Sequence, residues 1–180
     1  MKKYECVFLD RDGTLNPDSG YINNISDFNF YRFTIPALKI MSKKNNKFCI
    51  VTNQSGVARG LISIDNLFII NDFIKKEFSN HNINLIDIYM CYDHPDTSSD
   101  RRKPGPGMFL DAKKDHNLSL SNCLMIGDSI IDMQAGINLG METMLVLTGR
   151  GQDTLKTFGD IKLVTYVVSN LYEGSDLLCH

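Results

Sequence analysis

The stretch "CVFLDRDGTLN", residues 6–16, decides the fold. Four apolar residues, typical of a strand that is buried on both faces, run directly into Asp10 and Asp12, which only Arg11 separates. Gly13 then lets the backbone turn tightly. The pattern predicts a buried strand that ends in a polar turn, with two carboxylates at the mouth of an apolar strand.

Short apolar runs of this kind recur along the chain, and longer amphipathic segments separate them. The runs predict strands over residues 4–9, 48–52, 86–90, 124–126, 143–147 and 166–168, and the periodic segments predict helices over 35–44, 64–79, 107–115 and 130–139. Strands that alternate with helices favour an α/β fold, a three-layer Rossmann-like parallel sheet with helices on both faces. Because no gap offers the ~50 residues of a further domain, we expect a single domain over residues 1–180 and no inserted cap domain.

The composition excludes several classes of protein. The 180 residues are 43% hydrophobic and 22% charged, as in a soluble globular protein, and the formal net charge of −2 offers no basic excess for binding nucleic acid. The apolar run near the start is too short for a signal peptide, and none approaches the ~20 residues of a membrane span. Five scattered cysteines suit reduced thiols. We therefore expect a cytoplasmic protein with no membrane or nucleic-acid partner, and a monomer is the simplest oligomeric state.

Polar residues follow each of the first four expected strands. They are "DRD" at 10–12, "TNQ" at 52–54, "RRK" at 101–103 and "GD" at 127–128. In parallel sheets the ligand lies beyond the carboxyl ends of the strands, so these residues should meet at one edge of the sheet.

The chemistry of these residues suits phosphoryl transfer. Asp10, Asp12 and Asp128 would repel one another unless a cation lay among them, and hard oxygen ligands suit Mg²⁺. Lys103 and the Thr52 hydroxyl can hold phosphate oxygens. Asp10 would attack phosphorus to give an aspartyl phosphate, and Asp12 would act as general acid and then as general base. A lone D-x-D is often only a loop cap, but the whole ordered set is very unlikely by chance.

Five segments carry a resemblance to a known family. "FLDRDGTLN", "DSGYI", "VTNQSGVARG", "RRKPGPGM" and "MIGDSIIDMQAG" resemble the haloacid dehalogenase superfamily of phosphatases. Within it they are most similar to the D-glycero-D-manno-heptose 1,7-bisphosphate phosphatases, whose sister group is the histidinol-phosphate phosphatases. The resemblance spans about residues 4–170, and "DSGYI" and "TNQSGVARG" favour the heptose branch.

The resemblance implies a role for each matching residue. It makes Asp10 the nucleophile and Asp12 the general acid/base, and it implies Mg²⁺ bound by the Asp10 side chain, the Asp12 backbone carbonyl and Asp128. It implies that Thr52 and Lys103 stabilise the transferring phosphoryl group. The residues that it implies contact the substrate are Asp18, Ser19, Gly20, Tyr21, Asn53, Gln54, Ser55, Arg102 and Ser129.

Ser129 departs from the family pattern, and Asp132 and Arg59 each allow two interpretations. Ser129 stands where relatives often carry a lysine that faces the substrate, which puts fine substrate contacts in doubt. Asp132 either steadies the water shell of the metal or is exposed in the first turn of its helix. Arg59 either reaches a substrate phosphate or caps a loop.

The segment before "RRKPGPGM" departs from the family more strongly. Relatives often bind a structural zinc there, with C-x-H and C-x-C motifs. This chain has Cys91, but Asp93 stands in place of the histidine, His94 comes one position late, and no cysteine lies between Cys91 and Arg101. A closed structural zinc site needs four such ligands, so we expect no structural zinc.

The leading interpretation is a Mg²⁺-dependent phosphatase that removes the 7-phosphate of a heptose 1,7-bisphosphate, a step towards lipopolysaccharide and other surface glycans. The partner it implies is a small phosphorylated sugar. Histidinol-phosphate phosphatase is the alternative among enzymes, with DNA 3′-phosphatase a distant third. A non-catalytic phosphate-binding module on the same scaffold is the alternative from another class, although such a module should have lost at least one of the catalytic residues. The anomer stays open.

Overall fold

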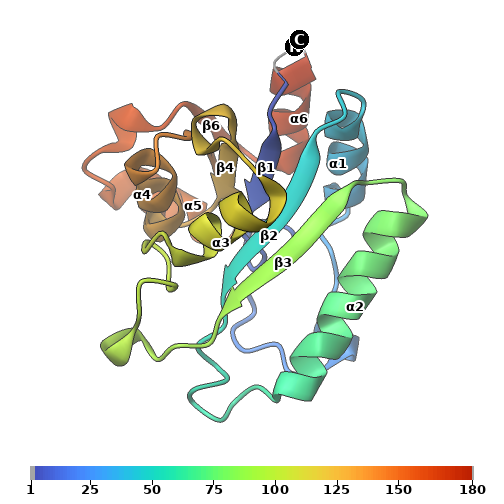
Figure 1. Ribbon diagram of the computed structural model, residues 1–180, viewed down its shortest axis with the longest axis vertical. Helices are drawn as coiled ribbons and strands as arrows, with labels where there is room; N and C mark the ends of the chain where they lie inside the picture. The colour runs from blue at the N-terminus through green and yellow to red at the C-terminus, as the bar shows by residue number, and fades with distance from the viewer. Residues whose placement is uncertain (1–2, 180) are drawn as a thin grey trace.

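A computed structural model describes residues 3–179 and shows one parallel sheet between two layers of helices (Figure 1). The six strands lie in the order β3-β2-β1-β4-β5-β6, and every neighbouring pair is parallel. This is the expected fold class. The strands are β1 (Cys6–Leu9), β2 (Lys47–Asn53), β3 (Leu85–Cys91), β4 (Leu124–Gly127), β5 (Glu142–Val146) and β6 (Tyr166–Val168).

Helices cover both faces of the sheet. One face packs against α1 (Thr34–Ser42), α2 (Ile64–Asn80) and α6 (Leu171–Cys179), with a core that includes Leu38, Ile74 and Leu178. The other face packs against α3 (Gly107–His116) and α4 (Ile130–Asn138), and α5 (Gly151–Thr157) lies on the same side (Figure 1). Helices α5 and α6 were not predicted from the sequence. Helix α5 is only 7 residues long and carries an exposed Leu155, so it offers little apolar periodicity.

The chain reverses its direction of travel across the sheet at β1. It runs outward from β1 through β2 to β3, and then returns to place β4 on the other side of β1. Such a switch point opens a crevice at the carboxyl ends of the two central strands. Asp10 and Asp128 follow these two strands directly, so the topology itself brings them together.

The connections at this edge of the sheet are loops with single turns of 3-10 helix. Ile25–Asp27 forms one such turn between β1 and α1, and Pro95–Thr97 forms another between β3 and α3. Neither connection holds an inserted domain. Within residues 3–179, no helix has both the length and the apolar character that a membrane crossing requires.

The aromatic contact between β1 and α3 should be a main source of stability. Phe8 is fully buried, and its ring meets that of Phe109 edge-on, with centroids 5.2 Å apart. We expect Phe8→Ala to lower the free energy of unfolding by about 3–5 kcal/mol in urea titrations, because a large buried ring is lost. Leu110→Ala, at a side chain of α3 that is 44% exposed, is the matched control and should change it by about 0.5 kcal/mol or less. Equal losses for the two variants would contradict this packing.

Candidate active site

A cleft of ≈ 340 Å³ opens at the carboxyl ends of the central strands. Among the residues predicted for the site, Ser19 is the only one that does not line this cleft. Arg59 does not line it either, and its backbone amide bonds to Ser55 within the loop. The predicted residues that do line the cleft are Asp10, Asp12, Asp18, Gly20, Tyr21, Thr52, Asn53, Gln54, Ser55, Arg102, Lys103, Asp128 and Ser129.

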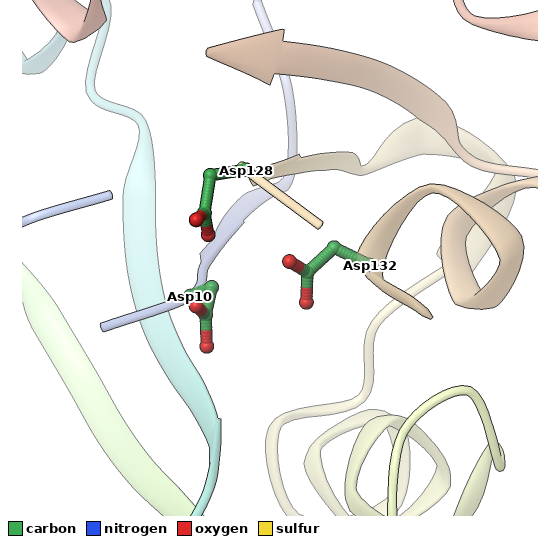
Figure 2. Close-up of side chains that lie close together, drawn as sticks. All are labelled: Asp10, Asp128 and Asp132. Atoms are coloured by element: carbon green, nitrogen blue, oxygen red, sulfur yellow. The ribbon is translucent and has the colours of Figure 1, made fainter. Parts of the chain in front are cut away.

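Three carboxylates and one ammonium group form the floor of the cleft. Asp10, Asp128 and Asp132 each offer an oxygen within 4.8 Å of the others (Figure 2). The Lys103 Nζ lies 2.6 Å from Asp10 Oδ1 and 2.7 Å from Asp132 Oδ1, and it donates to the Val51 carbonyl at 2.7 Å. The three N–H groups of the lysine therefore each have a partner.

Burial and mutual repulsion set the protonation of this group. Burial raises the pKa of Asp10, and Asp132 and Asp128 add to the effect while Lys103 opposes it. Burial, followed by repulsion from Asp132, raises the pKa of Asp128 to about 7. Burial acts to lower the pKa of Lys103, but Asp10 and Asp132 outweigh it, so the pKa is raised and the ammonium stays charged.

This donor set fits a hard divalent cation. Three carboxylate oxygens converge where a single ammonium balances only part of their charge, and oxygen ligands of this kind suit Mg²⁺. Asp132 thus joins Asp10 and Asp128 in the candidate metal site. The role of the Asp12 backbone carbonyl as a ligand stays a prediction.

The interpretation of Asp132 as an exposed residue is wrong, because its side chain is fully buried. One carboxylate oxygen faces Lys103. The other accepts hydrogen bonds from the Ser129 amide at 3.1 Å and the Ser129 hydroxyl at 2.5 Å, and so forms the capping box of α4. The Ser129 hydroxyl, which the sequence placed against the substrate, therefore serves the helix cap while it lines the cleft.

Asp12 is held by side chains from three places in the chain. The Arg11 guanidinium bonds to it through Nε at 3.1 Å and Nη2 at 2.7 Å. The amides of Asn16 and Gln54 each donate to it at 2.9 Å. Burial acts to raise the pKa of Asp12, but the Arg11 guanidinium, helped by the two amides, outweighs it and holds the pKa below its usual range. Sequence reasoning gave Arg11 no role, although its place between two aspartates was visible.

The loop that joins β5 to α5 also reaches the site, and nothing in the sequence singled it out. The Thr148 hydroxyl donates to the Gly13 carbonyl at 2.6 Å, and the Arg150 amide donates to Asp128 Oδ2 at 2.7 Å. Gly13 has a φ of +88°, and a Cβ there would overlap the Asp128 carboxylate. A side chain at this position would therefore displace a candidate metal ligand.

The segment that follows β2 fixes the lysine loop in place. The side chain of Asn53 donates to the Lys103 carbonyl and accepts from the Lys103 amide, both at 3.1 Å. Gln54 also bonds to the Thr52 hydroxyl at 2.9 Å. The two motifs, far apart in sequence, dock through paired hydrogen bonds.

The rim of the cleft carries charge and an aromatic ring. Arg150, whose side chain is 74% exposed, lies 3.4 Å from Asp18 through its Nε. Asp18 also accepts from the Gly20 amide at 3.3 Å, and Tyr21 is 49% exposed. Arg102 donates to the Asp93 carbonyl at 3.3 Å, which anchors one side of its guanidinium beside the cleft.

The segment for which the sequence predicts no structural zinc is closed by hydrogen bonds. Asp93 Oδ2 accepts from the Ser99 amide at 2.7 Å and from the Ser99 hydroxyl at 2.6 Å. His94 Nδ1 accepts from the Asp96 amide at 3.3 Å. These bonds use two of the few candidate ligands in this segment, and the absence of structural zinc stays a prediction.

Removal of the lysine should destabilise the protein through its buried carboxylates. We expect Lys103→Met to lower the free energy of unfolding by about 3–5 kcal/mol in a chelating buffer, because Asp10 and Asp132 lose their counter-charge. Mg²⁺ should raise the Tm of this variant more than that of the wild type, because the cation then supplies the missing charge. Lys113→Met, on the exposed face of α3, is the control and should change little. Equal stability of the two variants would show that the ammonium does not balance the cluster.

Proteins of similar sequence point to one family of phosphatases. The family model described as "HAD-hyrolase-like" matches residues 100–174. A D-glycero-beta-D-manno-heptose-1,7-bisphosphate 7-phosphatase from Photorhabdus laumondii is 38% identical over 157 residues, which are 83% of this chain and 84% of the relative. The alpha-anomer enzyme from Campylobacter jejuni is 35% identical over 177 residues, which are 97% of this chain and 99% of the relative.

A solved structure shows the same relationship in three dimensions. The crystal structure of D,D-heptose 1,7-bisphosphate phosphatase from B. bronchiseptica, complexed with magnesium and phosphate, superposes with a TM-score of 0.89. It is 30% identical in sequence, and the match covers 99% of this chain and 98% of the other.

Proposed function

We propose that this chain, which belongs to the D-glycero-D-manno-heptose-1,7-bisphosphate 7-phosphatase family of haloacid dehalogenase-like hydrolases, removes the 7-phosphate of that bisphosphate with Mg²⁺. One observation carries the proposal: Asp10, Asp12, Asp128 and Lys103 all line a single cleft. A phosphatase that forms an aspartyl phosphate needs a carboxylate nucleophile, a second carboxylate for proton transfer, and positive charge for the phosphoryl oxygens.

In the first step, a carboxylate oxygen of Asp10 attacks phosphorus and forms an O–P bond. The bond between phosphorus and the C7 oxygen of the sugar breaks, and its electron pair stays on that oxygen. The negative charge of the bound phosphate ester, together with the loss of the Gln54 hydrogen bond, favours the protonated form of Asp12 in the complex. Asp12 then gives its proton to the leaving oxygen, so that the sugar departs as an alcohol.

In the second step, Asp12 acts as the base. It takes a proton from a water molecule, whose oxygen attacks the phosphorus of the aspartyl phosphate. The bond between phosphorus and Asp10 breaks, so inorganic phosphate leaves and the Asp10 carboxylate is restored. Each group then stands as it began, with Asp12 protonated for the next turnover.

Positive charge around the phosphoryl group comes from the chain and from the metal. Lys103 and the Thr52 hydroxyl bind the phosphoryl oxygens, and Lys103 does so by exchanging one of its three present partners. Asp10, Asp128 and Asp132 would hold Mg²⁺, which would supply positive charge to neutralise the transferring group.

The rim of the cleft suits a sugar carrying a second phosphate. Arg102 and Arg150 line the cleft beside Tyr21, and loops rather than an inserted domain surround it. We further propose that the chain acts on a small phosphorylated sugar in the cytoplasm as a monomer, and that it supplies heptose for lipopolysaccharide or other surface glycans. Histidinol phosphate is the alternative substrate, and a non-catalytic phosphate-binding module is the alternative from another class.

Substrate choice is tested by phosphate release from both anomers of the heptose bisphosphate, with histidinol phosphate alongside. We expect kcat/KM to be highest for one bisphosphate anomer. Asp10→Asn should lower kcat by on the order of 10⁴-fold or more, because the amide cannot form the phosphoenzyme. Activity on histidinol phosphate alone would indicate a histidinol-phosphate phosphatase. Activity on none of the esters would favour the non-catalytic phosphate-binding module.

Metal dependence is tested at Asp128. Its carboxylate lies in the candidate metal cluster, so Asp128→Asn should raise the Mg²⁺ concentration needed for half-maximal activity at least about 10-fold. Titration of Mg²⁺ into chelator-treated enzyme measures this. Asp153→Asn, at an exposed site on α5, is the control and should match the wild type. An unchanged Mg²⁺ requirement in Asp128→Asn would remove this residue from the metal site.

A further inference from the structure

The hydrogen bonds to Asp12 use the whole accepting capacity of its carboxylate. Oδ1 accepts from Arg11 Nε and from Asn16 Nδ2. Oδ2 accepts from Arg11 Nη2 and from Gln54 Nε2. A carboxylate has about four lone-pair positions, so each of them has a donor here. An acid/base group must keep one position free for its proton, and therefore one of these four donors has to leave during catalysis.

Arg11 is the least able of these donors to leave. Its side chain is fully buried, and its planar fork holds both oxygens of Asp12 at once. The guanidinium lies against the ring of Phe28, with Cζ 5.9 Å from the centroid. Its remaining nitrogen, Nη1, is buried with no hydrogen-bond partner among the described residues, an arrangement that costs stability. The fork thus fixes the plane of the Asp12 carboxylate from the side of the core.

Asn16 and Gln54 also differ in how readily each can leave Asp12. Asn16 is fully buried, and its amide is also bonded to the Pro17 carbonyl at 2.9 Å. Gln54 lines the cleft, and its amide has an alternative acceptor in the Thr52 hydroxyl at 2.9 Å. Gln54 can therefore release Asp12 Oδ2 while its amide stays hydrogen-bonded.

We propose that Arg11 is a positioning residue for proton transfer: with Asn16 it holds Asp12 at a fixed angle, so that Oδ2 meets the leaving oxygen once Gln54 yields. The inference rests on the proposed function, because it takes Asp12 as the acid/base group. Arg11 does not line the cleft, and it acts only through its two hydrogen bonds to Asp12. Its effect should appear only where the leaving oxygen needs a proton.

Leaving groups that differ in basicity test this directly. A sugar alkoxide needs the proton of Asp12, whereas 4-nitrophenolate leaves with little help. Because kcat/KM reports steps up to formation of the phosphoenzyme, we expect Arg11→Met to lower it about 10²-fold for the heptose bisphosphate and for simple alkyl phosphates. The value for 4-nitrophenyl phosphate should change little. Equal losses for alkyl and aryl esters, or no loss for either, would overturn the proposal.

Two further variants separate orientation from charge. Arg11→Lys keeps the charge but lacks the fork, so it should show the same dependence on the leaving group as Arg11→Met. A wild-type profile in Arg11→Lys would mean that charge alone suffices, against the proposal. Gln54→Met should keep the leaving-group dependence of the wild type, because Arg11 and Asn16 still hold the carboxylate. A steeper dependence there would assign the positioning to Gln54.

Controls distinguish this role from simple loss of stability. Ile74→Ala removes a fully buried side chain of α2, so it lowers Tm without touching Asp12 and should leave the leaving-group dependence unchanged. In an Asp12→Asn background, Arg11→Met should add no further loss on alkyl esters, and an additive loss would contradict action through Asp12. If the wild type hydrolyses no ester, the proposed function fails together with this inference. Activity on simple esters without activity on the heptose bisphosphate overturns only the choice of substrate.

Discussion

The balance of charge at the carboxyl ends of β1 and β4 is the constraint on which the site depends. Asp10, Asp128 and Asp132 lie together in a buried place, and the Lys103 ammonium is bonded to two of them. Unpaired buried charges are costly, so the lysine must be held where it is. Its backbone is docked to Asn53 by two hydrogen bonds, which makes the loop after β3 part of the same unit as β2.

On the other side of the cluster, single residues also make two structural contacts each. Asp132 pairs with the lysine through one oxygen and caps α4 through the other, so the start of that helix and the floor of the cleft are built by one side chain. Asp128 accepts from the Arg150 amide, and Thr148 bonds to the carbonyl of Gly13. The loop after β5 thereby closes over the turn that carries the two N-terminal aspartates. Four connections of the sheet meet at this one group of charges.

Asp10 and Asp12, two residues apart, stand in different surroundings, and this difference suits two different tasks. Asp10 lies among carboxylates and an ammonium, where a cation and a phosphate can share its charge. Asp12 lies among hydrogen-bond donors that hold it rigidly and favour its ionised form. Under the proposed function, a phosphate ester would bring new negative charge to both carboxylates. Loops that carry Asp18, Arg102 and Arg150 surround the cleft.

The sequence by itself determined the parallel α/β fold and the edge at which the site lies. Apolar runs with polar residues directly after them are local features, and the rule that strand ends share an edge turns them into a site containing Asp10, Thr52, Lys103 and Asp128. It missed α5, which is only 7 residues long, and α6, whose buried stripe includes the small residues Gly174 and Ser175 between Leu171 and Leu178. Only the tertiary structure decided the contacts and burial of Arg11, Asp132 and the loop at Thr148, because these depend on which distant segments lie beside a residue. The sequence pattern of an aspartate in the first turn of a helix is the same whether its side chain faces water or a buried lysine. Only the packing of the folded chain distinguishes the two cases.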